Sequence, residues 1–71
     1  MEEKLKSWGW YHVGACSCTP KKYKYKNDNA PEYQVRVIRK YNTFELRKRN
    51  HIITQAGADM LEAALKAEGL L

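Results

Sequence analysis

Four side chains of this sequence could together bind a metal ion: the cysteines of Cys16-Ser17-Cys18 and the two histidines, His12 and His51. Structural zinc sites use about four Cys or His ligands in a tetrahedral arrangement. Common zinc motifs, however, place about two to four residues between paired cysteines, whereas one residue separates this pair. A C-x-C pair also closes a short, strained disulfide ring. The pattern therefore favours two thiols in a loop, with a zinc site as the less favoured alternative.

The same residues could form a catalytic dyad, in which a histidine activates a cysteine thiolate. Neither histidine has a carboxylate at a suggestive spacing, and His51 follows an expected turn, where an exposed histidine is common. We therefore expect a protein that is not an enzyme and that uses no cofactor.

Tyrosines alternate with lysines in the segment KYKYK (residues 22–26), and Tyr41 directly follows Arg39 and Lys40. Aromatic rings beside cations suit single-stranded nucleic acid, because bases stack on rings and phosphates require positive charge. In a β-strand, however, the two tyrosines of KYKYK point to one face and the three lysines to the other. The rings are then equally well explained as side chains that cover the sheet.

Positive charge is concentrated in the middle of the chain. Ten lysines or arginines and three acidic residues lie between Pro20 and Asn50, a net charge of +7, whereas residues 57–71 carry −2. Such a field favours polyanions, namely nucleic acid, acidic proteins or anionic lipid. The alternative is that these cations only solvate the outer face of a sheet and protect its edges from aggregation.

Neither a secretory signal peptide nor a membrane span is expected. Glu2 and Glu3 stand where a positively charged n-region would be, and no apolar run of about 7–15 residues follows. No segment approaches membrane-spanning length. We expect a cytoplasmic protein, in a reducing compartment that keeps cysteines as thiols.

The hydrophobic pattern predicts one domain, residues 1–71, built around a β-meander over residues 22–55. Alternating residues predict strands at Lys22–Lys26, Tyr33–Arg39, Thr43–Lys48 and His51–Gln55, the first of them an edge strand because of its lysines. Turn-forming residues separate these segments. Residues 12–21 are small and contain Gly and Pro, which is typical of a loop, and residues 1–11 are compatible with a short helix or with an irregular arm.

Residues 58–69 predict a C-terminal helix, because strong helix formers lie between Asp59, near the N-terminal end, and Gly69, a natural stop. The expected fold class is α+β: a small antiparallel meander of three or four strands with this helix packed on one face. The core should contain at least one tryptophan together with Tyr33, Val35, Val37, Phe44, Leu46, Ile53, Met60, Leu61, Ala64 and Leu65.

Strands followed by the helical sequence LEAALKAEGLL, with residues 1–11 as a first helix, resemble a double-stranded RNA-binding domain. That family carries a lysine-rich motif at the start of its last helix, which holds phosphates. The corresponding segment here, TQAGAD (residues 54–59), contains no lysine. The resemblance therefore implies a topology and not the binding function.

A second resemblance covers residues 16–65. Cys16-Ser17-Cys18, Pro20, Tyr23 and Tyr25, followed by NTF (residues 42–44) and HII (residues 51–53), are similar to small uncharacterised proteins of bacterial, phage and mobile-element genomes. This resemblance implies no activity.

These observations together favour a small non-enzymatic binding module. Its first candidate partner is DNA or RNA, bound by phosphate neutralisation with some base stacking and little sequence readout. The candidate binding residues are Lys22, Tyr23, Lys24, Tyr25, Lys26, Arg36, Arg39, Lys40, Arg47, Lys48 and Arg49. The alternative is a protein-interaction or self-association module, including a homodimer, that uses an exposed strand edge or sheet face.

Overall fold

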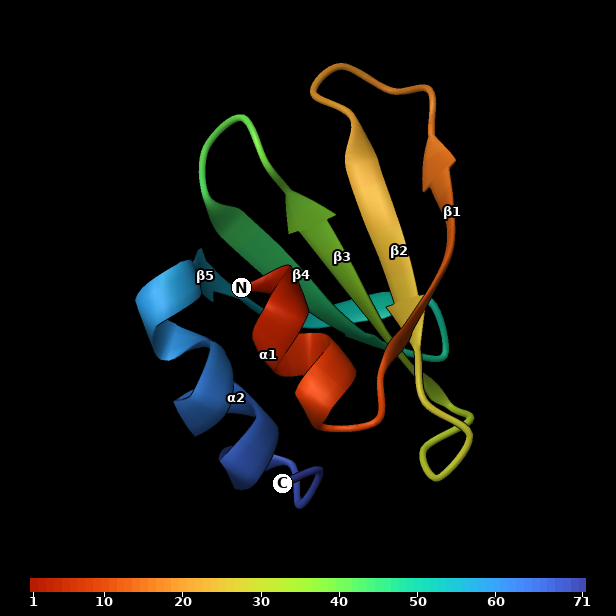
Figure 1. Cartoon of the computed structure of the whole chain (residues 1–71), viewed down its shortest axis with the longest axis vertical. Coiled ribbons are helices and arrows are strands. Elements are labelled where there is room, and N and C mark those ends of the chain that lie inside the picture. The colour runs from red at the N-terminus through yellow and green to blue at the C-terminus, as the bar shows by residue number, and fades with distance from the viewer.

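The computed structural model describes residues 1–71 as an antiparallel sheet with two short helices on one face (Figure 1). The elements in chain order are α1 (Glu2–Ser7), β1 (Tyr11–Cys16), β2 (Lys22–Lys26), β3 (Tyr33–Ile38), β4 (Thr43–Lys48), β5 (His51–Gly57), the 3-10 helix η1 (Ala58–Met60) and α2 (Leu61–Ala67). The strands follow one another in the sheet in the order β1-β2-β3-β4-β5. The α+β class is confirmed, but the expected number of strands, three or four, is wrong, because the sheet has five.

The additional strand is β1, which occupies part of the segment expected to be a loop. Its sequence YHVGAC contains small residues, so its own preference for the extended state is weak. Its pairing with β2 also shifts register between His12 and Gly14. Pairing with β2, from Tyr11 opposite Lys26 to Cys16 opposite Lys22, holds it in the sheet. Consequently β2 is an internal strand, and the two edge strands are β1 and β5.

Both helices pack against the same face of the sheet, which we call the covered face (Figure 1). Leu5 of α1 and Leu61 and Leu65 of α2 join one core cluster with side chains of β2, β3 and β4. Trp10, in the link between α1 and β1, is the buried tryptophan. The ambiguous N-terminal segment is therefore a short helix that contributes to the core.

Most of the expected core is confirmed: Val35, Val37, Phe44, Leu46, Leu61, Ala64 and Leu65 are buried. Tyr33 is half-buried against the cluster. The prediction that Ile53 and Met60 belong to the core is wrong, since these residues are 41% and 50% exposed. Leu46 pairs with Thr54 and Arg47 with Ile52, so that a bulge leaves Ile53 unpaired; Met60 lies in η1, before α2 begins.

The turns lie at two opposite ends of the sheet. Residues 39–42 join β3 to β4 at one end, and residues 27–32 and Arg49-Asn50 join strands at the other end. Arg49 and Asn50 both have positive φ, 49° and 69°, as a two-residue hairpin with the right-handed twist of its strands requires. The basic residues at 39–40 and at 49 are therefore far apart, as expected for a meander. None of the helices is long and apolar enough to cross a membrane.

Candidate functional site

The sheet face opposite the helices, which we call the open face, carries most of the polar strand residues. Strand alternation and the pairing register place Lys24, Arg36, Glu45 and Gln55 in one row across β2, β3, β4 and β5. The charged residues of this face are five cations and one acid: Lys22, Lys24, Lys26, Arg36, Arg47 and Glu45. The open face is therefore basic, with a formal charge of +4 from these six side chains.

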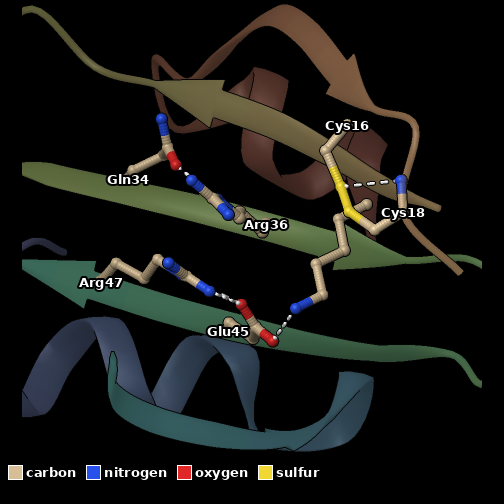
Figure 2. Close-up of a disulfide and its surroundings, with 7 residues drawn as sticks. Cys16, Cys18, Gln34, Arg36, Glu45 and Arg47 are labelled. Atoms are coloured by element: carbon tan, nitrogen blue, oxygen red, sulfur yellow. Dashed lines mark hydrogen bonds and ion pairs between the residues drawn. A yellow bond between two sulfur atoms is a disulfide. The ribbon is translucent and has the colours of Figure 1, made fainter. Parts of the chain in front are cut away.

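Glu45 is the only acid among them and is held between two cations. Its carboxylate accepts hydrogen bonds from Lys22 Nζ at 2.7 Å and from Arg47 Nη2 at 2.8 Å, although its side chain is only 3% exposed. Burial alone raises the pKa of Glu45, but the hydrogen bonds from Lys22 and Arg47 outweigh it and lower the pKa below the usual 4.5. Figure 2 shows Glu45 turned toward Arg47 on this face. The ionised carboxylate thus fixes both cations in place.

Arg36, like Lys24 and Lys26, has no carboxylate partner among the ion pairs of this face. Its Nε donates a hydrogen bond to Gln34 Oε1 at 2.6 Å, whereas its two Nη groups make no hydrogen bond. Burial and, next, repulsion by Arg47 lower the pKa of the Arg36 guanidinium. Figure 2 shows Gln34 and Arg36 side by side on the open face. Arg36 is therefore oriented by a neutral amide and keeps its paired Nη donors available for an external anion.

A depression of about 390 Å³ lies at the end of the open face that carries the turns 27–32 and 49–50. It is lined by Lys26, Pro31, Glu32, Tyr33, Gln34, Arg36, Arg49 and Asn50. The two turns are joined by a backbone hydrogen bond from Arg49 N to Glu32 O at 2.9 Å and by an ion pair between their side chains at 2.6 Å. The depression therefore has a defined wall that is built from segments distant in sequence.

The tyrosines of KYKYK face away from these lysines. Tyr25 is 1% exposed, and its hydroxyl donates to Glu2 Oε1 at 2.7 Å; burial and Glu2 raise its pKa to about 12. The ring of Tyr23 lies under the guanidinium of Arg39, 3.6 Å away. Neither ring is available to a base on the open face. Tyr11, which pairs with Lys26 across the β1–β2 ladder, is an exposed aromatic residue beside these lysines.

The remaining predicted cations lie off the open face. Arg39 pairs with Glu2 of α1 at 2.8 Å, Lys40 lies over the ring of Tyr41 at the turn, and Lys48 lies over Tyr33. The structure therefore brings together five of the predicted basic residues, with Arg49 at the rim of the depression. Sequence reasoning missed Gln34, Glu45 and Asn50. The only signal for Glu45 was that it occurs among cations on an alternating strand.

The four candidate metal ligands do not come together. His12 is in β1 and His51 is in β5, at opposite edges of the sheet, and no three His, Cys, Asp or Glu side chains form a group that could hold a metal. Cys16 and Cys18 are joined by a disulfide, so the expectation of two thiols is wrong. The chain turns directly after β1 and brings the two Cα atoms to 5.4 Å, within the range that a disulfide spans.

No family model, no curated protein and no solved structure matches this chain. The resemblance to small bacterial and phage proteins therefore stays a prediction.

Proposed function

We propose that this chain is a non-enzymatic module that binds nucleic acid, with the sugar-phosphate backbone lying across the open face. The observation that carries the proposal is the segregation of charge: five cations project from the uncovered face, and their one acidic neighbour is already ion-paired. A concentrated basic face supplies sequence-independent affinity for phosphates.

The arrangement of the cations suits a chain of phosphates. Lys22, Lys24 and Lys26 repeat about every 7 Å along β2, because alternate residues of a strand share a face. Arg36 and Arg47 extend the charge across β3 and β4. Since Lys22 and Arg47 are both ion-paired with Glu45, Lys24, Lys26 and Arg36 are expected to contribute most to the free energy of phosphate binding. Base stacking on Tyr23 and Tyr25 has no place in this mechanism, so little sequence readout is expected.

The test is a titration of labelled single-stranded and double-stranded DNA and RNA at low and moderate salt, with two charge-matched variants. Lys24→Gln/Arg36→Gln removes two charges from the open face, and Lys6→Gln/Lys40→Gln removes two exposed charges elsewhere. The first variant should bind at least about tenfold more weakly than the parent, and the second should lose much less. Equal losses in the two variants, or no binding at low salt, would contradict the proposal.

A specific feature of β5 favours a second candidate, a protein-interaction or self-association module. This edge strand, HIITQAG, contains no lysine or arginine and exposes Ile52 and Ile53, whereas edge strands are commonly protected by charge. Sedimentation at increasing concentration tests the self-association form. This candidate is favoured if the mass of the parent rises with concentration while Ile53→Lys keeps the mass of a monomer. The association of the parent should then depend only weakly on salt.

A further inference from the structure

The depression at the end of the open face has a composition that suits a doubly charged anion. Three cations line it, Lys26, Arg36 and Arg49, against one carboxylate, Glu32. The formal charge of the lining is therefore +2, which matches the charge of about −1.5 to −2 that a phosphomonoester carries near neutral pH. A backbone phosphodiester, with one charge, would leave the lining undercompensated.

Donors of the right geometry are also present. The free Nη pair of Arg36 forms a fork that can donate two parallel hydrogen bonds to a phosphate, and the Gln34 contact holds the guanidinium in one orientation. The amide of Asn50 adds a further polar group to the lining.

We propose that this depression binds the terminal phosphomonoester of a nucleic-acid strand, with Arg36, Lys26 and Arg49 as its ligands. The inference rests on the proposed function, because the strand whose end enters the depression is the one that lies on the open face. Glu32 competes with the phosphate for Arg49, since the two side chains form an ion pair at the rim. The site therefore distinguishes a phosphorylated strand end from a hydroxyl end.

The experiment compares oligonucleotides of one sequence that carry a 5′-phosphate, a 3′-phosphate or hydroxyls at both ends. One phosphorylated form should bind the parent at least about tenfold more tightly than the hydroxyl form, because charge-assisted hydrogen bonds to phosphate are strong. Arg49→Asn should reduce this ratio to within about threefold and leave the hydroxyl form nearly unaffected. Asn tolerates the positive φ of this position, and Arg49 is largely exposed, so the fold should be unaffected.

Glu32→Gln should have the opposite effect on binding. It should raise the affinity for the phosphorylated strand, since Arg49 is released from its ion pair. Equal affinity of the parent for all three oligonucleotides would overturn the depression proposal and leave the proposed function standing. A second arm uses inorganic phosphate and a nucleoside monophosphate, with the Arg Nε–H signals of the protein as the readout. A shift of the Arg36 signal without oligonucleotide binding would show that the depression takes a small phosphate, and it would overturn both the nucleic-acid function and the strand end as the occupant. No shift and no binding would overturn the phosphate site as well.

Discussion

At the scale of single residues, Glu45 has two opposed effects, because it stabilises the fold while it neutralises part of the open face. Glu45→Gln should lower the free energy of unfolding by about 1–3 kcal/mol, since the Lys22 and Arg47 contacts to a charged group are lost. The same change should tighten nucleic-acid binding, because the face gains one positive charge. Denaturant unfolding and a binding titration measure the two effects. Glu62→Gln, which breaks an exposed ion pair with Lys66, should change stability by much less.

The lowered pKa of Glu45 also makes the stability of the fold depend on pH. Its pKa in the folded protein is lowered, so its contribution is present above the unfolded value and is lost as the pH falls through the folded value. Glu2, whose pKa is lowered first by the hydrogen bond from Arg39, acts in the same direction. We expect the free energy of unfolding to decrease as the pH falls below about 4.5, and to decrease less steeply in Glu45→Gln. Parallel curves for parent and variant would show that Glu45 is not held ionised.

At the scale of elements, local sequence pattern predicts the strands that contain alternating residues and fails for those held by pairing. The segments of β2, β3 and β4 agree with the expected strands to within a residue, because KYKYK, YQVRVI and TFELRK alternate. In β1, the glycine and the cysteine give no such signal, and only the ladder with β2 keeps the segment extended. The separation of lysines from tyrosines on β2 was predictable from alternation alone. The depression was not, since it depends on two turns that meet through Glu32 and Arg49.

The packing of α2 on the covered face gives a prediction with an internal control. Leu61 is 1% exposed in the core, whereas its neighbour Met60 is 50% exposed. Leu61→Ala should cost about 2–5 kcal/mol of stability, enough to unfold much of a domain this small, because it leaves a cavity. Met60→Ala should cost less than about 0.5 kcal/mol. Thermal melting of both variants measures the difference, and similar melting temperatures would contradict the packing of α2.

At the scale of the whole molecule, charge is separated across the thickness of the sheet. The open face carries +4 from its six charged strand residues, while residues 57–71, which carry −2, include η1 and the helix α2 on the other side. A polyanion is therefore drawn to one side of the molecule. If a single strand neutralises these four charges, the logarithm of the binding constant should fall with the logarithm of salt concentration with a slope of about −3.

The salt slope can be measured in the same titration for Lys24→Gln/Arg36→Gln. Removal of two phosphate contacts should make the slope shallower, by about 1.4. An unchanged slope would place the phosphate contacts on other residues.

The position of a bound strand on the protein can be measured directly. An oligonucleotide with a spin label at its centre broadens the NMR signals of nearby protein groups. Lys and Arg side chains report on the open face and on the helices, and backbone amides report on β5, which contains no lysine or arginine. If the strand lies across the open face, broadening should be strong at Lys24, Arg36 and Arg47 and weak at Lys6 and Lys66 on the helices. Broadening concentrated on the helices or along β5, with the open face unaffected, would contradict this position of the strand.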